Sequence, residues 1–136
     1  MSGISLKLAL RANAAFSGCS GAYLALFGRQ ASRLTLASPE AGGEWGLRAL
    51  GVGLVAYAAL LARLSGGAAE RPREVWAVIA GDVAWVIGSA AWILFASPTL
   101  SATGTDIVAG VAVVVGLFAV LQWLALIRRQ PTSTAA

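Results

Sequence analysis

The feature that most constrains this chain is the way its apolar residues fall into four long blocks, separated by charged residues, prolines and glycines. The blocks cover residues 6–28, 45–63, 75–96 and 106–127. A helix needs roughly 20 apolar residues to cross the ~30 Å hydrocarbon core of a bilayer. Lipid offers the backbone no hydrogen bonds, so runs of this length fold as helices. The sequence therefore predicts an all-α bundle of four transmembrane helices, a single domain over 1–129 with a disordered tail over 130–136.

The first two blocks have the shortest uncharged stretches. Only 14 uncharged residues separate Arg48 from Arg63, so the second block crosses a bilayer only if both arginines extend toward the headgroups. The first block has 17 uncharged residues between Arg11 and Arg29. A lipoprotein signal that ends at Cys19 is the alternative for this block. We disfavour it because the apolar stretch between Arg11 and Cys19 is only seven residues long.

The composition agrees with a membrane location. Apolar residues make up 58% of the chain, charged residues 12%, and the mean hydropathy is +0.77. Soluble domains are about one-quarter charged, and a soluble fold of this length could not bury so much apolar surface. The net charge of +4 does not indicate a nucleic-acid partner, because the basic residues are scattered between the apolar blocks.

The basic residues instead predict the orientation in the membrane. Seven of them flank the block ends on the side of the two termini: Lys7, Arg11, Arg63, Arg71, Arg73, Arg128 and Arg129. Three lie on the opposite side: Arg29, Arg33 and Arg48. Cytoplasmic segments carry the excess of basic residues, so both termini are expected in the cytoplasm. Nine of the ten basic residues are Arg, and Ala, Gly and Val abound, as in GC-rich bacterial genomes. We therefore expect a bacterial inner membrane.

Polar side chains inside the blocks predict where a site would lie. Each block carries at least one in its cytoplasmic half, and together they form a candidate intramembrane cluster of Arg11, Asn13, Tyr57, Asp82 and Gln122. A charge in hydrocarbon costs at least ~2.5 kcal/mol on insertion scales, so an ionisable residue there needs a partner or water. Arg11 lies on a stripe of small residues at helical spacing, which indicates a surface where membrane helices pack closely. We therefore expect an Arg11–Asp82 ion pair inside the bundle.

This cluster has three interpretations. It is a structural clamp that fixes the register of the helices, which we favour, or it is a ligand or proton site that opens to the cytoplasm. In the third interpretation there is no cluster, because Arg11 extends toward the headgroups and Asp82 is protonated or paired elsewhere.

Two of the five tryptophans, Trp85 and Trp92, share the helix face of Asp82. They are either packing residues, which we favour, or the walls of an aromatic pocket for a flat ligand such as a quinone or carotenoid. The other three, Trp45, Trp76 and Trp123, fall near the ends of the blocks, where interfacial anchors lie.

The types of residue present argue against catalysis. The chain has no His and a single Cys, so it lacks the commonest general base and metal ligand and forms no internal disulfide. It has no Walker loop and no Cys-x-x-Cys motif. Residues 51–56 match the dinucleotide fingerprint, but they lie inside an apolar block with no strand before them. We predict that the protein is not an enzyme and has no catalytic residues, no cofactor and no metal site.

Two segments resemble known proteins. Leu10-Arg-Ala-Asn-Ala-Ala-Phe-Ser-Gly-Cys-Ser-Gly21 and Asp82-Val-Ala-Trp-Val-Ile-Gly-Ser89 are similar to the first and third helices of small uncharacterised bacterial four-helix integral membrane proteins. The resemblance covers nearly the whole chain and carries over no catalytic residue. Small multidrug exporters have a similar length and helix count, but they carry a membrane-embedded Glu in the first helix, which this chain lacks.

Three functions follow as expectations. The favoured one is a non-catalytic structural or accessory subunit that contacts the lipid bilayer and associates as a homo-oligomer or within a larger membrane complex. The second is a small transporter or channel that uses Asp82 and Arg11. The third is a bundle that binds a lipid, quinone or pigment between its helices, with Trp85 and Trp92 as walls.

Overall fold

The computed structural model describes residues 5–68 and 70–129, so the predicted tail over 130–136 lies outside the described residues. The described chain is helical throughout, with five α-helices and one short 3-10 helix. These are α1 (Leu6–Leu26), α2 (Gly28–Thr35), α3 (Ala41–Ser65), α4 (Pro72–Phe95), η1 (Ser97–Thr99) and α5 (Ala102–Ile127).

The predicted bundle of four transmembrane helices is wrong. Among the described residues, three helices are long and apolar enough to cross a membrane, namely α3, α4 and α5. The first predicted span instead forms α1, which ends at Leu26, and the start of α2, which follows after a break at Phe27. α1 is less apolar than the other long helices because Lys7, Arg11 and Asn13 interrupt its first half. The coarser prediction of a helical membrane protein is confirmed by the three apolar helices.

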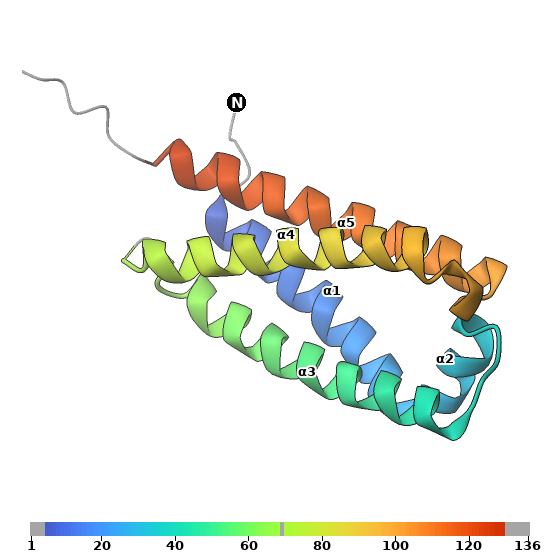
Figure 1. Cartoon of the computed structure of the whole chain (residues 1–136). Coiled ribbons are helices and arrows are strands. Elements are labelled where there is room, and N and C mark those ends of the chain that lie inside the picture. The colour runs from blue at the N-terminus through green and yellow to red at the C-terminus, as the bar shows by residue number, and fades with distance from the viewer. Residues whose placement is uncertain (1–4, 69, 130–136) are drawn as a thin grey trace, which may run out of the picture.

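The long helices form two antiparallel pairs (Figure 1). α1 packs along α3, and α4 packs along α5. The pairs are joined mainly through α1 and α5, whereas α3 and α4 make few direct contacts although they follow one another in the chain. The two helix pairs are therefore held together by contacts other than an α3–α4 interface.

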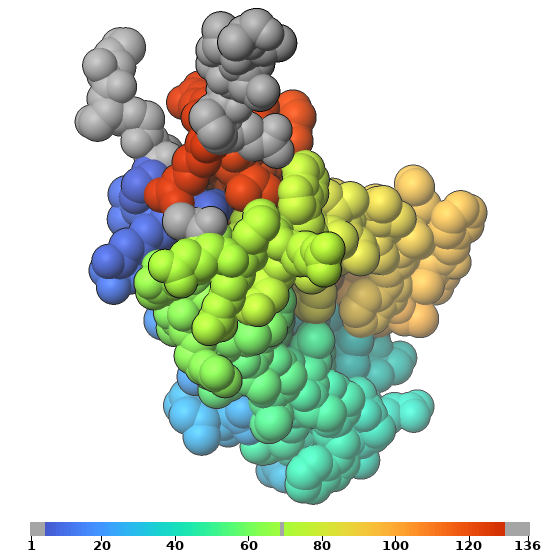
Figure 2. Space-filling view, turned by 90° about the vertical axis from the view of Figure 1, so that its left-hand side faces the viewer, coloured from blue at the N-terminus to red at the C-terminus, as the bar shows by residue number. Residues whose placement is uncertain are grey.

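Both ends of the described chain lie at the same end of the molecule. Figure 2 looks onto this end, where the blue start of α1, the red end of α5 and the yellow-green start of α4 gather. The apolar core is concentrated here, with Leu6 and Leu10 of α1, Leu61 of α3 and Val75 of α4 fully buried. In a bilayer the burial of such side chains is favoured by van der Waals packing between the helices, so this end is held by apolar packing.

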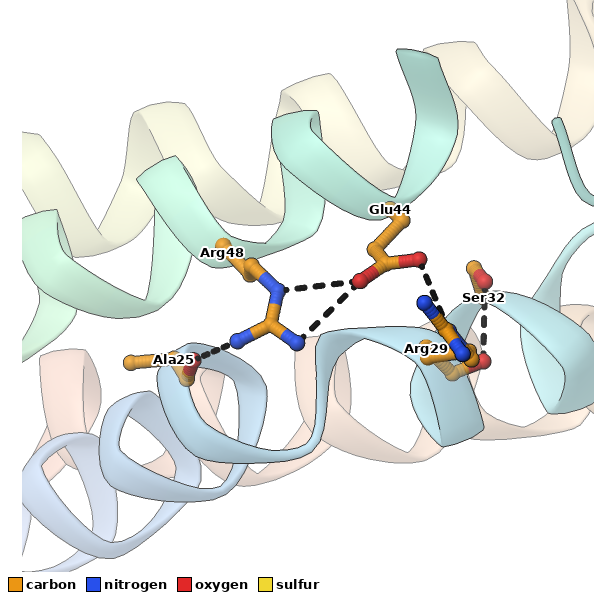
Figure 3. A network of polar contacts seen from close by, with 5 residues as sticks. All are labelled: Ala25, Arg29, Ser32, Glu44 and Arg48. Atoms are coloured by element: carbon orange, nitrogen blue, oxygen red, sulfur yellow. Dashed lines mark hydrogen bonds and ion pairs between the residues drawn. The ribbon is translucent and has the colours of Figure 1, made fainter. Parts of the chain in front are cut away.

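The opposite end is held by polar contacts (Figure 3). α1 ends at Leu26, which leaves its last carbonyls without helical partners. Arg48 of α3 donates to one of them, the carbonyl of Ala25, over 2.8 Å, and also pairs with Glu44 over 3.1 Å. Arg29 at the start of α2 pairs with the other oxygen of Glu44 over 3.3 Å. The sequence led us to expect that Arg48 extends toward the headgroups. In the structure it caps the end of α1 instead.

α2 is joined to the segment before α5 by backbone hydrogen bonds. The Ala37 N–H donates to the Thr99 carbonyl over 3.0 Å, and the Ser101 N–H donates to the Thr35 carbonyl over 2.9 Å. A Cβ on Gly104 would collide with the backbone of Thr35, so only glycine allows this approach. These bonds satisfy backbone groups of two connecting segments and tie the first helix pair to the second.

α1 and α3 cross closely at a pair of glycines. A Cβ on Gly21 would lie 2.7 Å from the Gly51 carbonyl oxygen and 2.9 Å from the Val55 nitrogen. A Cβ on Gly51 would in turn collide with the backbone of Gly21 and Ala25. Small residues allow this approach of two backbones, which is a common basis of helix association in membranes.

We expect Gly51→Ala to lower the thermal unfolding midpoint in detergent, measured by circular dichroism. The added methyl group meets backbone atoms that cannot move aside, and such overpacking costs about 1–3 kcal/mol. Gly53→Ala is the matched control, because a Cβ on Gly53 meets nothing within 4 Å. It should leave the midpoint unchanged or raise it, since alanine favours helix over glycine by about 1 kcal/mol. Equal midpoints for the two variants would contradict the close crossing.

Candidate functional site

The candidate site is centred on Asp82, the eleventh of the 24 residues of α4 and therefore near the middle of that helix. Its side chain is buried, with 3% of the residue exposed. Asn13 of α1 donates from Nδ2 to Oδ2 over 2.7 Å, and Tyr57 of α3 donates from its hydroxyl to Oδ1 over 2.9 Å. Gln122 of α5 donates from Nε2 to Oδ2 over a longer 3.4 Å. One carboxylate thus joins all the long helices.

A second hydrogen bond orients the Asn13 amide. Ser17, one helical turn further along α1, donates from its hydroxyl to Asn13 Oδ1 over 3.1 Å. With Oδ1 held by Ser17, the Nδ2 group faces Asp82 and donates to it. Ser17 is missing from the predicted cluster, yet its spacing of four residues from Asn13 places both on one helix face, which is the signal that could have identified it.

The predicted ion pair between Arg11 and Asp82 does not form. Among the described residues no salt bridge joins Asp82 to a basic side chain, and Arg11 is exposed. Arg11 and Asn13 are two positions apart, which is about 200° around a helix, so they cannot both face Asp82. The structure thus brings together Asn13, Tyr57, Gln122 and Asp82 from the predicted cluster and leaves Arg11 outside it.

A cavity of about 200 Å³ lies beside this cluster, between the long helices. It is lined by Phe16, Ser17, Ser20, Leu54, Tyr57, Gly81, Asp82, Trp85, Val111 and Val115. The polar groups are the hydroxyls of two serines and one tyrosine, the Asp82 carboxylate and the Trp85 indole, and the rest of the wall is apolar. Small-molecule sites are usually lined by apolar side chains with a few polar groups.

The two tryptophans predicted to form an aromatic pocket have different surroundings. Trp85 lines the cavity, and its Nε1 is buried without a hydrogen-bond partner among the described residues. Trp92 is 38% exposed, donates from Nε1 to Thr99 Oγ1 over 2.9 Å and does not line the cavity. The two residues share a helix face, but seven positions separate them by about 10 Å along the axis. Phe16 and Tyr57 are the other aromatic residues of the wall.

This arrangement favours binding over bond-making chemistry. Asp82 receives hydrogen bonds from neutral groups only, which stabilise a carboxylate in place without activating a nucleophile. In the part of the chain that the structure describes, no three His, Cys, Asp or Glu side chains come together as a candidate metal site. The site can hold a charge and a small apolar molecule next to each other.

We expect Asn13 and Asp82 to be energetically coupled and Arg11 and Asp82 to be independent. In a double-mutant cycle of unfolding free energies in mixed micelles, Asn13→Ala with Asp82→Ala should show a coupling of about 0.6–2 kcal/mol, typical of hydrogen bonds between membrane helices. Arg11→Ala with Asp82→Ala should be additive within about 0.5 kcal/mol. Coupling of Asp82 to Arg11 with none to Asn13 would contradict this geometry.

Comparison with known proteins adds no further information on the site. No protein-family model matches the chain, and no similar protein was found among the curated proteins or the solved structures. The resemblance to small bacterial membrane proteins therefore stays a prediction.

Proposed function

We propose that this protein is a non-catalytic membrane protein that binds a small lipid-soluble molecule in the cavity beside Asp82. The observation that carries the proposal is the position of a largely apolar cavity of about 200 Å³ half-way along the long helices. If α3, α4 and α5 cross the bilayer, this cavity lies near the bilayer centre, where lipid-soluble molecules concentrate.

The size of the cavity supports a small ring-shaped ligand. An apolar cavity of about 150 Å³ is known to hold benzene, so about 200 Å³ accommodates a substituted aromatic ring or the headgroup of a longer molecule. Gly81 lines the cavity and is itself exposed, and it lies where α3 and α4 make few contacts. A ligand would enter from the lipid at this point, and a tail would extend through it.

The unpartnered indole of Trp85 supports the same proposal. A buried N–H group without a hydrogen bond is rare, and each one calls for an explanation. Trp85 Nε1 belongs to a residue of the cavity wall, so a ligand oxygen or nitrogen would supply the missing acceptor. A ligand with a carbonyl or ester group meets this requirement.

Transport through the molecule has less support. A transporter or channel that uses Asp82 and Arg11 needs a polar path, and Arg11 does not contact Asp82. Between the cavity and the end with both termini lies the apolar core around Leu6, Leu10 and Leu61. This packing favours a ligand that enters from the lipid over one that passes along the helix axes.

For the location, we propose a bacterial inner membrane with both ends of the chain in the cytoplasm. The starts of α1 and α4 and the ends of α3 and α5 carry seven basic residues, against three at the opposite end. The excess of basic residues supports a cytoplasmic location for the end with both termini.

A structural or accessory subunit is the second candidate. It is favoured by glycines whose surroundings are open: a Cβ on Gly53 of α3 or on Gly88 of α4 meets nothing within 4 Å. Such positions allow close packing of a further membrane helix, from a second copy or from another protein. A protein subunit that co-purifies in stoichiometric amount would support this candidate.

We expect Val111→Phe to abolish binding of a lipid-soluble ligand, because the larger side chain fills the cavity that Val111 lines. The measurement is native mass spectrometry after purification in mild detergent, complemented by binding of a small aromatic probe such as indole. Wild-type protein should carry a small molecule or bind the probe with saturation, and the variant should do neither.

Val113→Phe is the matched control on the same helix. Val113 is 65% exposed on the lipid-facing side, so the same enlargement there leaves the cavity open and should leave binding unchanged. If the wild-type protein carries no small molecule and binds no probe, the proposed function is wrong. Equal binding by all three proteins would likewise place the ligand outside this cavity.

A further inference from the structure

Among the residues that the structure describes, no positive charge is paired with the Asp82 carboxylate. The side chains that contact it from the three neighbouring long helices are Asn13, Tyr57 and Gln122, and none of them is a cation. Of these only Tyr57 can titrate, and a phenol is uncharged in neutral or acidic solution. A buried carboxyl group is neutralised either by a proton or by a cationic partner, because hydrogen bonds from neutral groups leave the net charge of a carboxylate in place. Within the described chain, Asp82 thus has three neutral donors and no counter-ion.

Asp82 also forms part of the cavity wall. A carboxylate has about four lone-pair positions, and three protein donors are directed at Asp82. About one position is therefore left for a cation in the cavity, in addition to the bonds from Asn13, Tyr57 and Gln122.

The rest of the wall indicates which kind of cation fits. Phe16, Tyr57 and Trp85 contribute aromatic rings, whose faces attract organic cations. Small hard metal cations need about six oxygen ligands, whereas the side chains of the wall supply oxygen only from Ser17, Ser20, Tyr57 and Asp82. An ammonium group with apolar substituents matches both the carboxylate and the rings.

On this basis we infer that the ligand of the cavity is a small lipid-soluble amine bound in its protonated form, an alkyl- or arylammonium whose charged nitrogen lies against Asp82 and whose apolar groups contact the aromatic wall. This inference rests on the proposed function and specifies the charge of the ligand. An oxygen on such a ligand would accept a hydrogen bond from Trp85 Nε1, which lines the cavity and has no partner among the described residues.

The test compares two ligands of the same shape, benzyltrimethylammonium and its uncharged carbon analogue neopentylbenzene. Binding to wild-type protein in an uncharged detergent is followed by tryptophan fluorescence and by the shift of the thermal unfolding midpoint. We expect the cation to bind at least about tenfold more tightly, which corresponds to about 1.4 kcal/mol. The preference should disappear in Asp82→Asn and persist in Asp106→Asn, a matched change at an exposed position of α5.

A second measurement remains informative if Asp82→Asn does not fold. Benzyltrimethylammonium keeps its charge at every pH, so protons compete with it for Asp82 of the wild-type protein. Its affinity should fall as the pH is lowered, while the affinity of neopentylbenzene should stay constant.

The possible failures can be told apart. If both ligands bind equally well and neither depends on pH, the charge inference is wrong and the proposed binding function stands. If the uncharged ligand binds more tightly, the charge inference is also wrong and the proposed binding function also stands. If neither ligand binds and Val111→Phe changes nothing, the proposed function fails together with the inference.

Discussion

The hydrogen bonds to Asp82 are the interaction on which the arrangement of the helices depends. A carboxylate in the middle of an apolar helix cannot face lipid without a large cost, so α4 must turn this face inward. Asn13, Tyr57 and Gln122 then bring α1, α3 and α5 to the same point. Because α3 and α4 make few other contacts, the bond between Tyr57 and Asp82 is a main link between these consecutive helices. The site therefore determines the register of the bundle as well as its chemistry.

The cavity exists because the two ends of the molecule are closed by different means. Leucines close the end with both termini, and the opposite end is held by Arg48, Glu44 and Arg29 together with the backbone bonds around Thr35. Between the ends, Gly21 and Gly51 draw α1 against α3.

Much of this fold could be predicted from local patterns. The apolar blocks give α3, α4 and α5 because a transmembrane helix is determined by length and hydropathy, which are properties of one segment. The predicted number of transmembrane helices was wrong because of α1. Its apolar block is interrupted by a break at Phe27 and contains three polar residues near its start. No proline marks this break, and its stabilisation by Arg48 comes from a residue more than twenty positions away.

The sequence predicted how far along each helix the site lies, but not which residue of α1 faces Asp82. The sequence indicated Asn13, Tyr57, Asp82 and Gln122 because exposing a polar side chain to lipid is costly, so such residues turn toward one another inside the bundle. The choice of Arg11 as the partner followed the attraction between opposite charges, but the rotation of α1 is set by the crossing of Gly21 and Gly51, which turns Asn13 and Ser17 toward Asp82. The prediction that Trp92 lines a pocket with Trp85 failed for a related reason. Two residues on the same helix face can still lie far apart along the helix axis.

The replacement of an expected cation by neutral donors changes what the site can do. With Arg11 as its partner, Asp82 would be neutralised within the protein. With Asn13, Tyr57 and Gln122 instead, the same carboxylate is held in place by side chains that carry no positive charge. Hydrogen bonding and neutralisation are separate requirements for a buried charge. The protein meets the first with its own side chains, and the adjoining cavity provides the space in which a ligand would meet the second.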